Sequence, residues 1–245
     1  MATLKQLDDT QLESFDTEYV NEARWKIVSA QIDRSFPDGN FTFLDVGGGN
    51  GQFADRLLAA YPKAQGTVLD NAQILLDRNK PNPRKQMINA SVADLHQQSG
   101  QTYDIICFNW LLHHLVSDSY GQTCQNISKT IGEVIPLLSA RGRISIFENM
   151  YDGIWLDRLP SHLIFELTSS KLLAKFTQKM GANTAGVGVC FLSQKKWCSV
   201  IAQHPLVIDR YTDDPSDWPI PLVRRVFLHM GYIRVGHFWL RSANQ

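Results

Sequence analysis

The stretch Phe43-Leu-Asp-Val-Gly-Gly-Gly-Asn-Gly51 decides how the rest of the chain is interpreted. Phe41 to Leu44 is mostly apolar and leads into Asp45-Val46, which predicts a buried strand, and the helix-like run Gln52 to Tyr61 follows the glycines. Glycine suits the turn between them, because it accepts positive φ and, without a Cβ, lets a ligand lie against the backbone. The amides that open the next helix can then face that ligand. The stretch therefore predicts strand, turn and helix, with the turn either binding a ligand or merely connecting the two elements.

The glycine spacing discriminates between ligands. The dinucleotide fingerprint G-x-G-x-x-G, begun at Gly47 and Gly49, needs glycine where this chain has Gln52. The chain instead satisfies G-x-G-x-G with Gly47, Gly49 and Gly51. On these residues the sequence resembles the class I S-adenosylmethionine (SAM) dependent methyltransferases, in which an acidic residue, here Asp45, precedes that motif. The resemblance implies SAM as the cofactor, with Asp45 and the three glycines in its binding site.

The residues that follow the turn extend the resemblance. Tyr61-Pro62 ends the helix, and Gly66-Thr-Val-Leu-Asp70 predicts a second strand that closes on a carboxylate. A carboxylate about 20 residues beyond the glycines can accept hydrogen bonds from the ribose hydroxyls of a nucleoside. The stretch from Asp45 to Asn71 is similar in style to small-molecule O-methyltransferases, which implies that Asp70 and Asn71 also contact the cofactor.

The adenine contacts depend on how the third strand, Gln86 to Asn89, is aligned with this family. One alignment, in which Asp94-Leu95 is the family's later D-L pair, places Ser91 at the position of the adenine ligand and Val92 against the ring. Counting back from the fourth strand makes Asp94 itself the adenine ligand. We prefer the first alignment and keep the second as its rival.

The fourth strand, Tyr103 to Asn109, is followed directly by Trp110-Leu-Leu-His-His-Leu115. This segment resembles the family's segment after that strand, where the backbone near Asn109 meets the amino group of the cofactor. The carboxyl ends of central parallel strands form the ligand crevice, so a methyl acceptor would lie here. One of His113 and His114 could act as a general base towards a hydroxyl. The alternative is that one or both histidines pack or cap the next helix, since methyl transfer can also proceed by orientation alone.

The composition limits the other function classes. Lys+Arg and Asp+Glu are equal at 24 each, so no global basic field attracts a nucleic acid. The four cysteines form no C-x-x-C pair, which is typical of reduced thiols in a cytoplasmic protein, and we expect no metal ion in the site. No apolar run is long enough for a membrane span, and we expect no membrane partner.

The predicted elements alternate, which indicates an α/β fold formed by the whole chain as one domain. We expect a doubly wound seven-stranded sheet, mostly parallel with an antiparallel last strand. Residues 16–36 predict an amphipathic helix that is either a lid, with Tyr19 or Arg24 reaching the carboxylate of the cofactor, or a helix packed on the sheet. Near the C-terminus, we assign Arg224, Arg225 and Arg234 to a solvated surface.

Residues 151–190 depart from the common core and predict strongly apolar helices. Their place after the fifth strand suggests a cap over the acceptor pocket, with His162, Glu166 and Asn183 as candidate acceptor contacts. The alternative is a dimer surface, and the two are compatible. The leading hypothesis is methyl transfer from SAM to a small organic acceptor, most readily at a hydroxyl, in secondary metabolism. The alternatives are a nicotinamide-dependent oxidoreductase and a non-catalytic methyltransferase-like SAM-binding protein.

Overall fold

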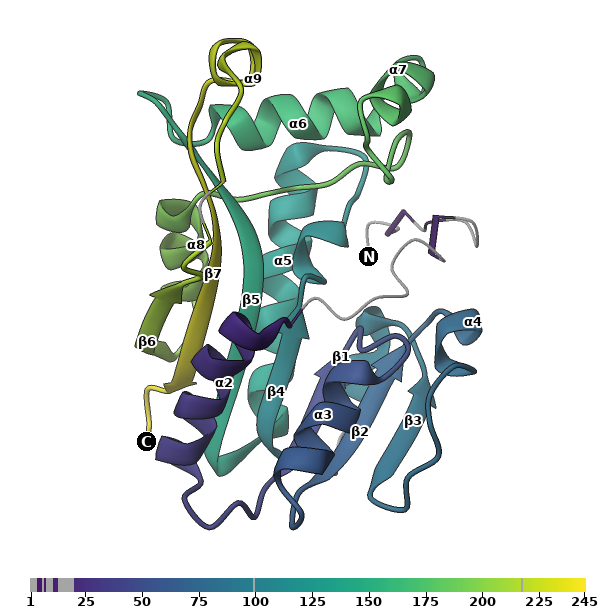
Figure 1. Ribbon diagram of the computed structural model, residues 1–245, viewed down its shortest axis with the longest axis vertical. Helices are drawn as coiled ribbons and strands as arrows, with labels where there is room; N and C mark the ends of the chain where they lie inside the picture. Colours follow the sequence, from purple (N-terminus) through teal and green to yellow (C-terminus); the bar gives the residue numbers. More distant parts are fainter. Residues whose placement is uncertain (1–3, 6, 8–10, 13–19, 99, 217) are drawn as a thin grey trace.

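The computed structural model describes residues 4–5, 7, 11–12, 20–98, 100–216 and 218–245. These residues form a seven-stranded sheet in the order β3-β2-β1-β4-β5-β7-β6 (Figure 1). The strands are β1 Thr42–Val46, β2 Gln65–Asp70, β3 Lys85–Asn89, β4 Tyr103–Asn109, β5 Leu138–Gly153, β6 Leu206–Asp213 and β7 Met230–Ser242.

The strand directions confirm the predicted fold class. β1 to β5 pair in parallel, whereas β7 runs antiparallel to both of its neighbours, β5 and β6. From β1 the chain winds outward to β3, crosses back to β4, and winds outward in the other direction. The reversal leaves a crevice at the carboxyl ends of β1 and β4, which is where open α/β sheets bind ligands.

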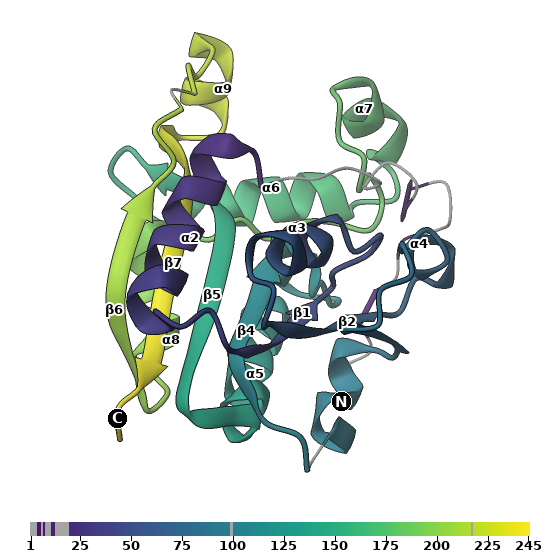
Figure 2. The ribbon, with the colours of Figure 1, turned by 60° about the horizontal axis from the view of Figure 1, so that its bottom comes forward.

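Helices cover both faces of the sheet, which gives three layers (Figures 1 and 2). The helices are α2 Glu22–Ser35, α3 Gln52–Ala60, α4 Gln73–Leu76, α5 Tyr120–Val134, α6 Leu159–Ser169, α7 Ala174–Lys179, α8 Gln194–Ile201 and α9 Leu222–Phe227, with 3₁₀ turns η1 Val92–Gln98, η2 Leu112–His114 and η3 Ile135–Leu137. One core cluster joins α2 and α3 to one face of the sheet, and a second joins α5 and α8 to the other. The central strands are buried on both faces, as the near-continuous apolar run of β4 predicts.

The β5 strand is longer than its apolar run predicts. It begins at Leu138, directly after η3, and continues to Gly153, so residues 151–153 of the expected cap insertion belong to the sheet. The extension is stabilised by β7, which pairs with β5 from Arg143↔Arg241 to Gly153↔Met230. The strand partner supplies backbone hydrogen bonds over this length, an effect that local sequence does not carry.

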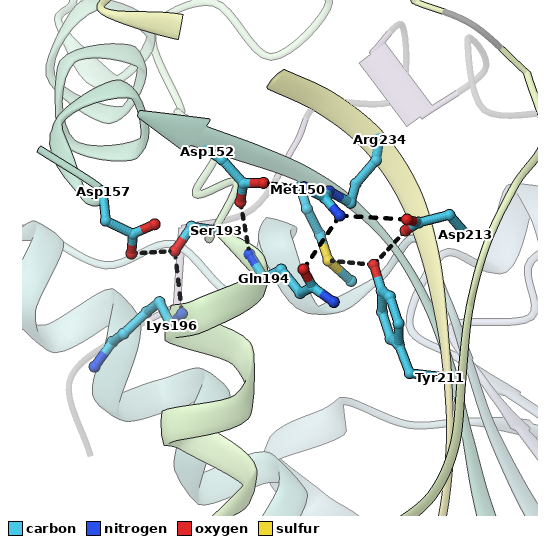
Figure 3. A network of polar contacts seen from close by, with 9 residues as sticks. All are labelled: Met150, Asp152, Asp157, Ser193, Gln194, Lys196, Tyr211, Asp213 and Arg234. Carbon is cyan, nitrogen blue, oxygen red and sulfur yellow. Dashed lines mark hydrogen bonds and ion pairs between the residues drawn. The ribbon is translucent and has the colours of Figure 1, made fainter. Parts of the chain in front are cut away.

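A polar network at the far end of the sheet corrects the expected surface position of Arg234 (Figure 3). Its guanidinium pairs with Asp152 of β5 and Asp213 of β6, and it donates to the side chain of Gln194 at 3.1 Å. Three strands and α8 thus meet at one half-buried arginine. Its neighbours in sequence, Arg224 and Arg225, are exposed as expected.

Among the described residues, no helix combines the length and apolar character that crossing a membrane requires.

Candidate active site

A cavity of about 690 Å³ lies at the carboxyl edge of the sheet, where β1, β2 and β4 end. Ten of the predicted site residues line it: Asp45, Gly47, Gly49, Asp70, Asn71, Ser91, Val92, Asn109, His113 and His114. The topology brings these residues together from four separate segments of the chain. Gly51 and Asp94 do not line the cavity.

The glycine turn forms one wall and is joined to Asp70. Gly49 has φ of +50°, a conformation that favours glycine, and its N–H donates to one carboxylate oxygen of Asp70 at 2.9 Å. The other oxygen accepts from the N–H of Ala72 at 2.8 Å. Burial raises the pKa of Asp70, and these N–H groups oppose that effect. A carboxylate has about four acceptor sites, so Asp70 can still receive a hydroxyl donor from a ligand.

Gly51 is required for packing rather than for lining the cavity. It precedes α3 with φ of +72°, and a Cβ at this position would lie 1.8 Å from the side-chain oxygen of Asn79. The amide of Asn79 in turn donates to the carbonyl of Gly49 at 2.8 Å. The third glycine therefore shapes the turn from behind, and its predicted contact with the cofactor stays a prediction.

Asp45 and Asn109, at the ends of β1 and β4, form a buried polar pair. The Asn109 amide donates to Asp45 Oδ1 at 3.3 Å, whereas Asp45 Oδ2 and Asn109 Oδ1 are buried without a hydrogen-bond partner in the described part of the chain. Burial raises the pKa of Asp45 to about 7. Buried acceptors without donors are costly, so two of them beside a cavity suit a ligand that brings N–H donors. An ammonium group would also favour the ionised carboxylate.

Another part of the cavity wall is formed by residues after β3. Ser91 and Val92 both line the cavity, as does Asn71, whereas Asp94 lies in η1 and donates its N–H to the carbonyl of Ser91 at 2.9 Å. This is the arrangement that the first of the two alignments predicts. The adenine contacts themselves stay a prediction.

His113 is held by a buried carboxylate that the sequence analysis did not single out. Its Nδ1 lies 2.6 Å from Glu148 Oε2 on β5, and the other oxygen, Oε1, accepts from the N–H of Leu112 at 2.8 Å. The Glu148 side chain is fully buried. A Glu148 carboxylate that accepts from Nδ1–H leaves Nε2 as the basic nitrogen of a neutral ring, which is the state a general base requires. The sequence did contain a signal for this role of Glu148, because it is a charged residue in a strand that is expected to be buried. Charged residues are seldom buried without a partner.

His114 has a different environment, although the two imidazole rings lie 4.1 Å apart. Burial lowers the pKa of His114 well below its usual value, and the neighbouring His113 lowers it further. A ring that resists protonation is a poor proton acceptor at neutral pH. The two predicted histidines are therefore not equivalent, and His113 is the better placed base.

Another wall comes from the N-terminal residues and from the segment after α7. Leu4, Lys5, Leu7 and Leu12 line the cavity ahead of α2, and Asn183, Val189 and Phe191 line it after α7. Phe191 packs on His113 with ring centroids 4.8 Å apart. The predicted contact Asn183 thus reaches the cavity, but His162 and Glu166 do not, because they pair with each other on the exposed side of α6 at 3.3 Å.

The helix at residues 16–36 is shorter than expected. It starts at Glu22, with Asn21 as its N-cap, and buries Val28 and Ile32 against the sheet. Arg24 forms an ion pair with Asp214 and stacks over the ring of Trp110, so the structure gives it partners other than a ligand. Tyr19 and the first part of the predicted helix lie outside the described residues, and the lid stays a prediction.

Comparison with known proteins shows that one family model matches the part of the chain that contains most of this site. The model of the family described as "Methyltransferase domain" matches residues 43–132, which include the glycine turn, Asp70 and both histidines. Residues 43–132 therefore match a methyltransferase domain in sequence. A search of the curated proteins gave no match.

Solved structures show that the fold of the methyltransferase domain extends over nearly the whole chain. The plantazolicin methyltransferase BpumL, in complex with a triazolic desmethylPZN analog and SAH, is 14% identical, with a TM-score of 0.60 over 95% of this chain and 88% of that one. An O-methyltransferase family protein from Burkholderia thailandensis is 14% identical, with a TM-score of 0.53 over 91% of this chain and 58% of that one. The mitomycin 7-O-methyltransferase MmcR is 15% identical, with a TM-score of 0.52 over 90% and 56%. This chain therefore spans less than two thirds of the length of the latter two proteins.

Proposed function

We propose that the protein transfers the methyl group of SAM to a hydroxyl of a small, largely apolar acceptor. The observation that carries this proposal is one cavity that is lined by the glycine turn, by Asp70 and by His113, whose buried partner is Glu148. The turn and Asp70 suit a nucleoside, and the histidine suits deprotonation of an acceptor. The mitomycin 7-O-methyltransferase and the Burkholderia O-methyltransferase family protein, which share the fold, are consistent with oxygen as the methylated atom.

The residues present fit SAM. Asp70 would hold the ribose, Ser91 and Val92 the adenine, and Asp45 with Asn109 the ammonium group, for which their buried acceptor atoms lack donors. When bound, SAM supplies an electrophilic methyl group on a sulfonium sulfur.

The contribution of the protein is orientation and a proton acceptor. Nε2 of His113 takes the proton of the acceptor hydroxyl as its oxygen becomes bonded to carbon. Glu148 keeps Nδ1 protonated and stabilises the charge that develops on the ring. The apolar walls at Val189 and Phe191 exclude water and bind an aromatic or aliphatic acceptor.

Calorimetric titration with SAM tests the cofactor site. The native protein should bind, Gly49→Arg should abolish binding by placing a long side chain in the cavity, and Asp70→Ala should weaken it about tenfold or more, because hydrogen bonds to a charged group are worth roughly 1.5–3 kcal/mol. Asp77→Ala is the matched control, since this exposed carboxylate is the C-cap of α4 and does not itself line the cavity. Equal affinities of all four proteins for SAM would refute the assignment.

Turnover is tested separately, with phenolic and aliphatic hydroxyl compounds as acceptors and SAH release as the readout. Methylated product with a new O–CH₃ group supports the proposal. Tight SAM binding without turnover on any hydroxyl acceptor, combined with loss of a protein partner in Asp45→Ala, would favour a non-catalytic SAM-binding protein instead.

A further inference from the structure

An exposed apolar surface at one end of the molecule has no role in the proposed function. Its residues lie on α7 and the turn before it, on α9, and on the segment between β5 and α6, and all three lie at the top of the molecule in Figure 1. In Figure 2, α7 and α9 again lie at the same end. The most exposed members are Trp155 at 86%, Leu172 at 96%, Phe176 at 58%, Leu222 at 75%, Val226 at 65% and Phe227 at 77%. Water-exposed apolar side chains in such number mark an interaction site.

Residues 171–180, of which Ala174–Lys179 form α7 and the others turns, have the residue spacing of a helix that lies on an interface. The apolar residues Leu172, Phe176 and Met180 are spaced four residues apart. An adjacent row with the same spacing consists of Lys171, Lys175 and Lys179. All six are exposed. One face of this segment therefore presents an apolar row beside a cationic row.

The α9 helix repeats this combination. None of its residues is buried, and Leu222 and Val226 share one side with Phe227, while Arg224 and Arg225 supply the charge. Trp155 is joined to the same region, because its N–H donates to His229 Nε2 at 3.0 Å.

The charge of the α7 and α9 segments is one-sided although the net charge of the chain is zero. Residues 171–180 have three lysines and no acidic residue, and α9 has Arg224 and Arg225 and no acidic residue. Two copies meeting through this surface would place like charges together, which is unfavourable. A flat anionic partner satisfies both the cations and the apolar side chains.

We propose that the exposed apolar surface docks on an anionic lipid bilayer, with the aromatic and aliphatic side chains of α7, α9 and the Trp155 segment entering the headgroup region. Attraction to anionic lipid adds to the burial of these side chains, and neither contribution requires a spanning segment. The expectation of no membrane partner considered only spanning segments. Since α7 is followed within a few residues by the cavity-lining Asn183, the docked surface lies near the end of the molecule that holds the cavity.

Vesicle co-sedimentation of the full chain tests the proposal without SAM or acceptor. The protein should sediment with vesicles of phosphatidylglycerol and phosphatidylcholine, but not with phosphatidylcholine alone, and 0.5 M salt, taken as roughly three times the physiological value, should weaken binding. Phe176→Asp and Phe227→Asp should each lower the partition coefficient about tenfold or more, since each loses apolar burial and adds a repelled charge.

Met87→Asp is the matched control. Met87 is 48% exposed on the edge strand β3, outside the exposed apolar surface, so the same change of charge there should leave binding unchanged. Light scattering of the same proteins tests whether a second copy of the chain, rather than lipid, binds the exposed apolar surface. A native dimer that Phe227→Asp dissociates, or vesicle binding that is absent or equally lowered by Met87→Asp, would overturn the proposal.

Discussion

Replacing Glu148 by glutamine tests the paired base most directly. In the native site Glu148 accepts from His113 Nδ1 at 2.6 Å and from the N–H of Leu112 at 2.8 Å. Glutamine has nearly the same shape and can keep the backbone contact through its oxygen. Its NH₂ group then faces Nδ1 and donates, so the ring must accept at Nδ1 and carry its proton at Nε2. The histidine would thus present a donor where the reaction needs a base.

The expected cost follows from the geometry. General base catalysis contributes about 10² to 10⁴ in rate, and the wrong tautomer forfeits most of it, so kcat should fall at least about 10²-fold, or roughly 2.7 kcal/mol. The KM for SAM should change little, because Glu148 does not line the cavity. Removing one charged hydrogen bond from a fully buried group should also lower the free energy of unfolding by about 1–3 kcal/mol.

Steady-state kinetics with SAH release as readout, SAM calorimetry and urea unfolding measure these quantities. Glu166→Gln is the matched control, because Glu166 pairs with His162 at 3.3 Å on a helix surface where both side chains are more than half exposed. An exposed pair is worth well under about 1 kcal/mol, so this variant should behave as the native protein. A Glu148→Gln enzyme that folds, binds SAM and keeps its native kcat would refute the role of His113 as a general base.

Three further outcomes follow from the glycine turn, the buried carboxylate and the strand network. Gly51→Ala should lower the free energy of unfolding by about 1–3 kcal/mol, since its φ of +72° is strained for alanine and the Cβ would meet Asn79 at 1.8 Å. Gly121→Ala is the control and should be neutral or stabilising, because the space around its Cβ is open. Asp45 has a pKa raised to about 7 in the folded protein, so it binds a proton more tightly there than in the unfolded chain, and the free energy of unfolding should fall as pH rises from about 4 through 7. The affinity for SAM should increase over the same range, because the ionised carboxylate attracts the ammonium group. Asp45→Asn should remove both trends, measured by unfolding and by calorimetry at each pH. Arg234→Met should cost about 1–3 kcal/mol in urea unfolding, because it leaves two half-buried carboxylates without their cation.

Each of these three predictions has a result that would contradict it. A Gly51→Ala protein as stable as Gly121→Ala would mean that the turn relaxes without strain. A SAM affinity that is flat from pH 6 to pH 8, taken as about one pH unit on each side of the raised pKa, would mean that Asp45 is not beside the bound ammonium. An Arg234→Met protein of native stability would assign the network in Figure 3 to the surface after all.

Most of the fold was predictable because its signals are local. An apolar run that ends in a glycine cluster and an amphipathic helix defines the first strand, turn and helix, and the same alternation repeats along the chain. The boundaries of a strand were not predictable where pairing with another strand determines its length. The β5 strand extends to Gly153 because β7 pairs with it there, and Arg234 is half-buried because three elements enclose it.

For the site, the sequence by itself indicated a set of candidate cofactor-binding and catalytic residues, most of which line the cavity. Gly47, Gly49 and Asp70 were identified by spacing, because the backbone between neighbouring parallel strands is short enough to fix their positions. Only the tertiary structure decided what each group does. Glu148 lies 35 residues from His113 in sequence, and the order β1-β4-β5 brings them within 2.6 Å. The same packing separates the two adjacent histidines into a carboxylate-bound ring and a desolvated one, since burial and partner geometry depend on the whole fold rather than on residue type.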